Sequence, residues 1–108
     1  MKRAHVRRAV KERVIEAELR ERVEAMGGLC VKVVVPGRRG HPDRMVVLPG
    51  PHVIMVETKR PKGGVLVPHQ RSWLERYAAL GLAVAVVRNC EDITALLKRE
   101  KAAVRPRL

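Results

Sequence analysis

One stretch of the chain constrains its fold more than any other: a run from Met45 to Val56 that is almost purely apolar and is broken only by Pro-Gly-Pro and His52. β-Branched and aliphatic residues on both sides of a short turn are typical of a β-hairpin. The sequence therefore predicts paired strands at 43–48 and 52–59. If the turn pairs Leu48 with His52, the same register places Asp43 opposite Glu57, whereas a bulge at the turn would shift the register by one residue.

The rest of the chain alternates between helical and extended patterns. Apolar residues at 15, 19, 23 and 26 form a helical stripe, which predicts a helix over 6–26 that ends at Gly27-Gly28. Two more strands are expected at 29–36 and 82–88, and two more helices from Pro68 to Gly81 and over 90–100. The strand at 82–88 is apolar throughout, which predicts burial on both of its faces.

The resulting order, αβββαβα, predicts an α/β fold in which a mixed β-sheet is flanked by helices. A chain of 108 residues suits one domain, so we expect a single domain over 1–108 with a basic tail at about 102–108.

The charge balance predicts a polyanionic partner. The chain has 23 Lys and Arg against 11 Asp and Glu, a net charge of +12. Nucleic acid is favoured over a membrane surface, because the sequence lacks a long basic helix with bulky apolar anchors. We expect a cytoplasmic protein, since the sequence has neither an apolar signal-peptide core nor a run of transmembrane length. Cys30 and Cys90 are expected to be small buried thiols.

The predicted register gives the charged residues at the ends of the hairpin a chemical meaning. Two carboxylates at facing positions, Asp43 and Glu57, repel each other unless a cation lies between them. Hard oxygen ligands suit Mg²⁺ or Mn²⁺. Lys59 projects to the same side as Glu57 and could hold or activate a water, which together makes the parts of metal-assisted phosphodiester hydrolysis. In the alternative interpretation, Asp43 caps its strand while Glu57 and Lys59 form an ordinary surface pair on an edge strand.

The spacing of these residues resembles a known signature. Pro42-Asp43, thirteen residues and then Glu57-Thr58-Lys59 are similar to the motif of the PD-(D/E)XK nuclease superfamily. A wider run, from about Ile15 to Leu97, resembles the VRR-NUC nuclease family through "IEAEL", "PGRRGHPDRMVVLPG", "VETKRPKGG" and "PHQ".

This resemblance implies a restriction-endonuclease-like core, Mg²⁺ or Mn²⁺ with no organic cofactor, and hydrolysis of branched or junction DNA, as in DNA repair. Small free-standing members of the family, often encoded by phages, look like homodimers that cut four-way (Holliday) junctions. We therefore expect a DNA endonuclease and a homodimer.

The resemblance also implies roles for individual residues. Asp43 and Glu57 match the metal-binding carboxylates, Lys59 the catalytic lysine, and Thr58 lends its backbone carbonyl to the metal. Glu16 matches an acid on the first helix that completes or positions the metal shell, although a solvated charge on a Glu-rich helix is the alternative.

Gln70 matches a catalytic Gln at the head of the helix after the core. It either binds a metal-bound water or Lys59, or caps its helix. His41 departs from the family, which usually carries a small apolar residue at this position, so contact with DNA and contact with a neighbouring side chain both stay open. His52 and His69 are expected to be turn and helix-start residues.

Basic residues beside the predicted site are expected to contact DNA phosphates. They are Arg38, Arg39, Arg44, Arg60 and Lys62.

Two other functions remain compatible with the sequence. One is a flap or fork nuclease of the same family. The other is a non-catalytic DNA-binding module that uses the same basic loops, for which Glu57 and Lys59 would be dispensable.

Overall fold

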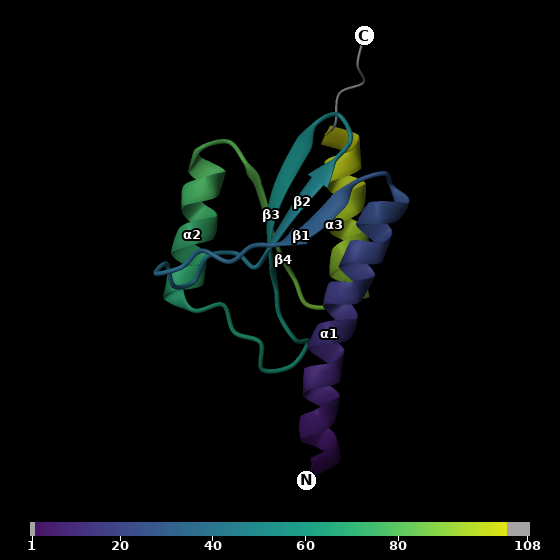
Figure 1. The fold of residues 1–108 in the computed structure, drawn as a ribbon, viewed down its shortest axis with the longest axis vertical. Coiled ribbons are helices and arrows are strands. Elements are labelled where there is room, and N and C mark those ends of the chain that lie inside the picture. The colour runs from purple at the N-terminus through teal and green to yellow at the C-terminus, as the bar shows by residue number, and fades with distance from the viewer. Residues whose placement is uncertain (1, 104–108) are drawn as a thin grey trace.

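Three helices flank a four-stranded sheet in the part of the chain that the structure, a computed structural model, describes (Figure 1). This part is residues 2–103, with side chains for residues 12–101. The elements are α1 (Lys2–Ala25), β1 (Leu29–Lys32), β2 (Arg44–Leu48), β3 (His52–Thr58), α2 (Pro68–Ala79), β4 (Ala83–Val87) and α3 (Cys90–Ala103). The predicted order and the α/β class are confirmed. Of the predicted basic tail, residues 102 and 103 continue α3, and residues 104–108 lie outside the described residues.

The sheet has the order β1-β2-β3-β4, and its hairpin has the register expected from the sequence. Strands β1, β2 and β3 pair antiparallel, whereas β4 pairs parallel to β3. Leu48 lies opposite His52, and the ladder runs without a bulge to Arg44 opposite Val56. Gly50 closes the turn with a φ of 134°, a backbone conformation that side chains with a Cβ rarely adopt. The simple turn therefore fixes which residues of the two strands face each other.

Helices α1 and α3 cover one face of the sheet and form the main core with it. Residues that alternate along each strand, such as Val46 and Ile54, are fully buried on this face. From α1 the predicted stripe contributes Ile15, Leu19 and Val23, each at most 5% exposed. This core fixes the position of α1 relative to the strand ends that carry the charged residues.

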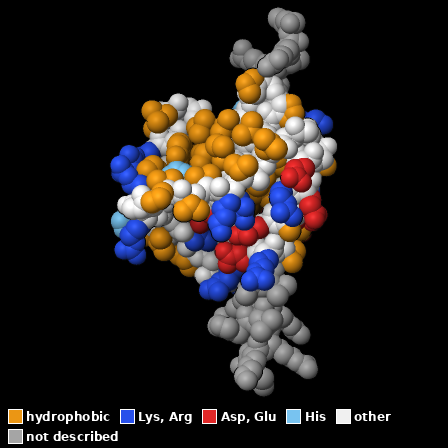
Figure 2. All heavy atoms as spheres, in the orientation of Figure 1, with side chains coloured by type: hydrophobic (Ala, Val, Ile, Leu, Met, Phe, Trp, Pro, Cys, Tyr) orange, Lys and Arg blue, Asp and Glu red, His pale blue; other side chains and the backbone are white. Residues whose placement is uncertain are grey.

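Helix α2 covers only part of the opposite face. Leu74 of α2 and Met55 of β3 are both buried, and α2 contacts β3 and β4. On β1 the side chains of the same face stay exposed: Leu29 is 60% and Val31 38% exposed. Figure 2 shows hydrophobic side chains gathered over the sheet beside α2. The strands β1 and β2 thus present an apolar surface that no helix in residues 2–103 covers.

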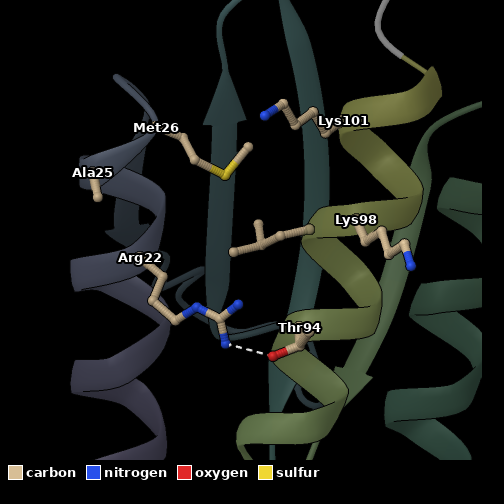
Figure 3. A pocket seen from close by; sticks show the side chains of 7 residues that line it. Arg22, Ala25, Met26, Thr94, Lys98 and Lys101 are labelled. Carbon is tan, nitrogen blue, oxygen red and sulfur yellow. Dashed lines mark hydrogen bonds between the residues drawn. The ribbon is translucent and has the colours of Figure 1, made fainter.

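A pocket of about 370 Å³ lies between the C-terminal part of α1 and α3. Arg22 of α1 crosses it and donates a hydrogen bond of 2.8 Å to the hydroxyl of Thr94, which ties the two helices together (Figure 3). Lys98 and Lys101 line the same pocket. Within the described residues, no helix is long and apolar enough to cross a membrane.

Three expectations about these elements are wrong in part. The strand predicted over 29–36 ends at Lys32, because the chain leaves the sheet after Val33 donates its N–H to the Asp43 carbonyl at 2.9 Å. Strand β4 is half-buried for most of its length, since it lies at the edge of the described sheet rather than inside it. Cys30 is buried as expected, but Cys90 is exposed because it begins α3 at the surface.

Candidate active site

The two carboxylates of the predicted motif lie at neighbouring strand ends. Asp43 directly precedes β2 and follows Pro42, which is fully buried and holds the chain at this point. Glu57 is the penultimate residue of β3. Since Arg44 pairs with Val56, the next facing positions are those of Asp43 and Glu57, as the sequence register predicted.

Thr58 holds the Asp43 carboxylate. Its backbone N–H donates to Oδ1 of Asp43 at 3.0 Å, and its hydroxyl donates to Oδ2 at 2.5 Å. Oε1 of Glu16 lies 3.4 Å from the same hydroxyl. A hydroxyl has a single hydrogen, so the shorter distance assigns it to Asp43. Asp43 is therefore fixed in place, and Glu16 reaches the site from α1 without a strong bond to it.

Glu57 is a buried acid whose carboxylate is only partly paired. Its residue is 6% exposed, and its Oε1 is buried with no hydrogen-bond partner among the described residues. The other oxygen, Oε2, accepts from Nε2 of Gln70 at 3.1 Å and lies 3.6 Å from Nζ of Lys59. Burial and, to a smaller extent, the nearby Asp43 carboxylate raise the pKa of Glu57, Lys59 offsets this rise only in part, and the resulting pKa is about 7. A buried acid with one free oxygen calls for a cation or a proton.

The pair of Glu57 and Lys59 is not an ordinary surface pair on an edge strand. Strand β3 lies between β2 and β4, and the side chain of Lys59 is 17% exposed. The backbone N–H of Lys59 donates to the Val87 carbonyl at 2.9 Å, which anchors this end of β3 to β4. The ammonium group is thus held beside the carboxylate and has limited access to solvent.

Gln70 both caps its helix and contacts a residue of the site. Its Oε1 accepts the backbone N–H of Val67 at 3.1 Å, which caps the start of α2, and its Nε2 donates to Glu57. The expected alternatives, a cap or a role in the site, are therefore combined, and its partner in the site is Glu57 rather than Lys59. Because both ends of the amide are used, its orientation is fixed.

Glu16 lies close to the site but forms an ion pair with Arg44. Nη2 of Arg44 lies 3.0 Å from Oε2 of Glu16, and the Arg44 side chain is 17% exposed. In residues 12–101, no group of three or more His, Cys, Asp or Glu side chains is placed to hold a metal. Of the side chains that the sequence assigned to the metal, Asp43 and Glu57 thus form a facing pair. Glu16 lies near them, on the other side of the Thr58 hydroxyl that donates to Asp43.

The predicted DNA-contacting residues differ in how accessible they are. Arg38, Arg39 and Lys62 are exposed on two loops, whereas Arg44 and Arg60 are half-buried. The loop that carries Arg38 and Arg39 packs closely on α2. A Cβ on Gly40, whose φ is +80°, would lie 2.7 Å from the His69 backbone.

The second loop folds back on the end of β3. A Cβ on Gly64 would lie 2.5 Å from the carbonyl oxygen of Arg60 and 3.0 Å from the Cβ of Lys59. Both loops therefore have defined positions beside the carboxylates.

His41 contacts neighbouring side chains, as one of its two expected roles required. Its Nε2 lies 2.6 Å from the hydroxyl of Tyr77, and its Nδ1 lies 2.9 Å from the carbonyl of Pro42. A tautomer with the proton on Nδ1 satisfies both contacts, with the Tyr77 hydroxyl as donor. The ring also packs edge-on against Trp73 at a centroid distance of 4.8 Å. This aromatic cluster, like the pairing of Arg44 with Glu16, left no signal in the sequence.

His52 takes part in a separate polar cluster at the turn end of β3. Its Nε2 lies 2.5 Å from Oε1 of the buried Glu100, whose other oxygen accepts from Arg99 at 2.6 Å. Burial alone would raise the pKa of Glu100, but the hydrogen bonds from His52 and Arg99 outweigh it and lower the pKa. His52 is therefore a structural residue at the first position of β3, far along the strand from Glu57.

Comparison with known proteins gives independent information about the family and the fold of the chain. The chain is 41% identical over 90 residues to "Putative nuclease p44" of Acyrthosiphon pisum secondary endosymbiont phage 1, which covers 83% of this chain and 95% of the relative. A solved structure described as "VRR_NUC domain" matches with a TM-score of 0.77 and 35% identity, over 82% of this chain and 95% of that chain. A second, described as "VRR_NUC domain protein", has a TM-score of 0.64 at 12% identity, over 82% and 86%, and shows the shared fold. No family model matches the chain.

Proposed function

The chain belongs to the VRR-NUC family of nucleases, and from this membership we propose that it is a divalent-metal-dependent DNA endonuclease that resolves four-way junctions as a homodimer. The observation that carries the proposed chemistry is the buried Oε1 of Glu57, which lacks a hydrogen-bond partner in the described part of the chain. This oxygen lies in a site that also contains Asp43 and Lys59. An acid in such surroundings is suited to a bound cation.

The donor set fits Mg²⁺ or Mn²⁺. Asp43 and Glu57 supply hard oxygen atoms from facing positions, and a cation between them would offset the burial and repulsion that raise the pKa of Glu57 to about 7. These two carboxylates and the backbone carbonyl of Thr58 would hold the ion, with Glu16 positioning the shell from α1. When bound, such an ion stabilises charge on phosphoryl oxygens and lowers the pKa of a coordinated water.

The chain's own residues would then orient the reaction. The ammonium of Lys59, 3.6 Å from Glu57, would hold the attacking water and stabilise negative charge on the phosphoryl oxygens. Gln70 fixes the direction of the Glu57 carboxylate through the bond from its Nε2. Thr58 does the same for Asp43 through its N–H and its hydroxyl. With both acids fixed in advance, little reorganisation is needed when the substrate binds.

The substrate would approach between the two basic loops. Arg38, Arg39 and Lys62 are exposed on the loops that precede β2 and follow β3 and can bind backbone phosphates, and Arg60 lies at the base of the second loop. A net charge of +12 favours association with a polyanion. A phage relative described as "Putative nuclease p44" is compatible with action in the cytoplasm of a bacterial cell or phage-infected host, and the role proposed there is in DNA repair.

Symmetric cutting of a four-way junction needs two sites related by a dyad, which a C2 dimer supplies. The exposed apolar surface of β1 and β2, where Leu29 is 60% exposed, supports such a pairing, since contiguous apolar patches on a protein surface often mark an interface (Figure 2). The proposed dimer would bury this surface and leave the ends of β2 and β3 free for DNA.

Cleavage of labelled linear duplex, flap, fork and four-way-junction DNA with Mg²⁺ or Mn²⁺ tests the proposal. Symmetric cuts in the junction are expected with metal, and none with EDTA or with Lys59→Ala. The matched control Lys98→Ala removes an exposed lysine near the end of α3 and should cut like the wild type. Tight binding without cleavage of any substrate would instead support a non-catalytic module, and preferred cutting of flaps or forks would overturn the junction assignment.

A further inference from the structure

A small polar pocket lies between α1 and the beginning of β2. Its volume is about 130 Å³, and its walls are Arg13, Glu16, Ala17, Arg20 and Arg44. The four residues from α1 follow the spacing i, i+3, i+4 and i+7, so they share one face of the helix. Ala17 has a small side chain, which leaves the centre of this face open. The walls therefore hold three guanidinium groups against one carboxylate.

The charges in this pocket do not neutralise each other. Glu16 pairs with Arg44 at 3.0 Å, which leaves the exposed Arg13 and Arg20 as an excess of two positive charges. The Nε of Arg44 is buried, and in the part of the chain with described side chains it has no hydrogen-bond acceptor. A buried donor without an acceptor is unfavourable, and a phosphate at the guanidinium of Arg44 would bring acceptor oxygens close to it. Guanidinium groups bind phosphate oxygens in pairs, so a phosphate group matches both the charge and the donors.

The pocket is next to the proposed active site. Oε1 of Glu16, one of its walls, lies 3.4 Å from the hydroxyl of Thr58, and this hydroxyl donates to Asp43. Arg44 directly follows Asp43 in the chain. A DNA strand whose scissile phosphate lies at Asp43 would thus continue toward this face of α1.

From these observations we infer that the pocket of Arg13, Arg20 and Arg44 around Glu16 binds a phosphate of the DNA strand beside the cut. The inference rests on the proposed function, because it takes the scissile phosphate to lie at Asp43. It assigns a role to the face of α1 that carries Arg13 and Arg20. Arg44 would bind this phosphate while it orients Glu16, which makes it a shared element of the pocket and the active site.

The test compares DNA binding in the cleavage-inactive Lys59→Ala background. Arg13→Ala with Arg20→Ala should weaken binding of the junction about tenfold and reduce the slope of log Kd against log salt by about 0.9, the value for one phosphate. The control pair, Lys98→Ala with Lys101→Ala, removes the same charge from exposed sites on α3, near the Glu100 contact with His52 at the other end of β3. This control pair should change Kd by less than about threefold, because only a screened long-range attraction to the DNA is lost.

Two further variants separate a built site from general attraction. Arg13→Lys with Arg20→Lys keeps the charge but removes the planar fork, and it should recover only part of the affinity. Inorganic phosphate should compete with DNA more strongly when Arg13 and Arg20 are both present than in the variant Arg13→Ala with Arg20→Ala. Equal losses for the α1 pair and the α3 pair would overturn the inference. Weaker binding for the α1 pair alone, in a protein whose parent cuts no DNA, would support the pocket while it refutes the nuclease proposal.

Discussion

Replacing Glu57 with Gln is expected to stabilise the metal-free protein at neutral and alkaline pH. Burial, followed by the effect of Asp43, raises the pKa of Glu57 from 4.5 to about 7 in the folded chain. The pKa returns to its ordinary value on unfolding, so between these pH values the folded state holds a proton that the unfolded state releases. The stability that Glu57 contributes is therefore complete below pH 4.5 and is lost as the pH rises through about 7.

The size of this effect follows from the two pKa values. At about 1.4 kcal/mol for each pH unit, the rise from 4.5 to about 7 destabilises the folded state by about 3 kcal/mol once Glu57 is ionised. Gln has nearly the same shape and no charge. We therefore expect Glu57→Gln to exceed the wild type in free energy of unfolding by about 3 kcal/mol at pH 8, and by no more than about 1 kcal/mol at pH 5.

Urea unfolding followed by circular dichroism, in EDTA at pH 5 and pH 8, measures both differences. Glu75→Gln, an isosteric change at an exposed position of α2, is the matched control and should behave like the wild type. Adding Mg²⁺ or Mn²⁺ at pH 8 should stabilise the wild type and not Glu57→Gln, because a ligand of the folded state raises its stability. If Glu57→Gln has the same advantage at both pH values, the reasoning about the buried acid is wrong.

Three more predictions test the surroundings of the site. Gly40→Ala should cost about 1 kcal/mol more than Gly37→Ala, because both have positive φ but only Gly40 packs against the backbone of α2; equal losses in urea unfolding would contradict this. Gln70→Ala should lower single-turnover junction cleavage roughly tenfold and leave Kd for DNA unchanged, since it removes a donor to the buried carboxylate; an unchanged rate would exclude a role in the site. Leu29→Lys should weaken the proposed dimer at least about tenfold in sedimentation equilibrium, whereas Val14→Lys, 51% exposed on α1, should not; a dimer unaffected by Leu29→Lys must use another surface.

The sequence predicted the hairpin well, because its register depends on local features. A short turn with Gly50 and two apolar strands leaves one simple pairing, and this pairing brings Asp43 opposite Glu57. Strand β1 was predicted too long, because its length depends on the length of its partner strand. Its β-branched run continues past Lys32, but the partner strand ends at Arg44, so the later residues have no partner in the described sheet.

Two contacts between distant segments could not be predicted from the sequence. Glu16 was assigned to the metal shell, and its ion pair with Arg44 depends on how α1 packs against the sheet. The placement of His41 between the hydroxyl of Tyr77 and the ring of Trp73 depends on the way the loop packs on α2. Such pairings arise from tertiary packing and have no local pattern.

The contact between the loop and α2 has a practical consequence, because Trp73 is the single tryptophan of the chain. Its indole N–H donates to the carbonyl of Arg39 at 2.9 Å, and the guanidinium of Arg76 lies 4.5 Å from its ring. Any displacement of the loop would break this bond and alter the polarity around the indole. The protein therefore carries its own fluorescent reporter, and the proposed binding of DNA at Arg38 and Arg39 can be followed from intrinsic emission without attaching a dye.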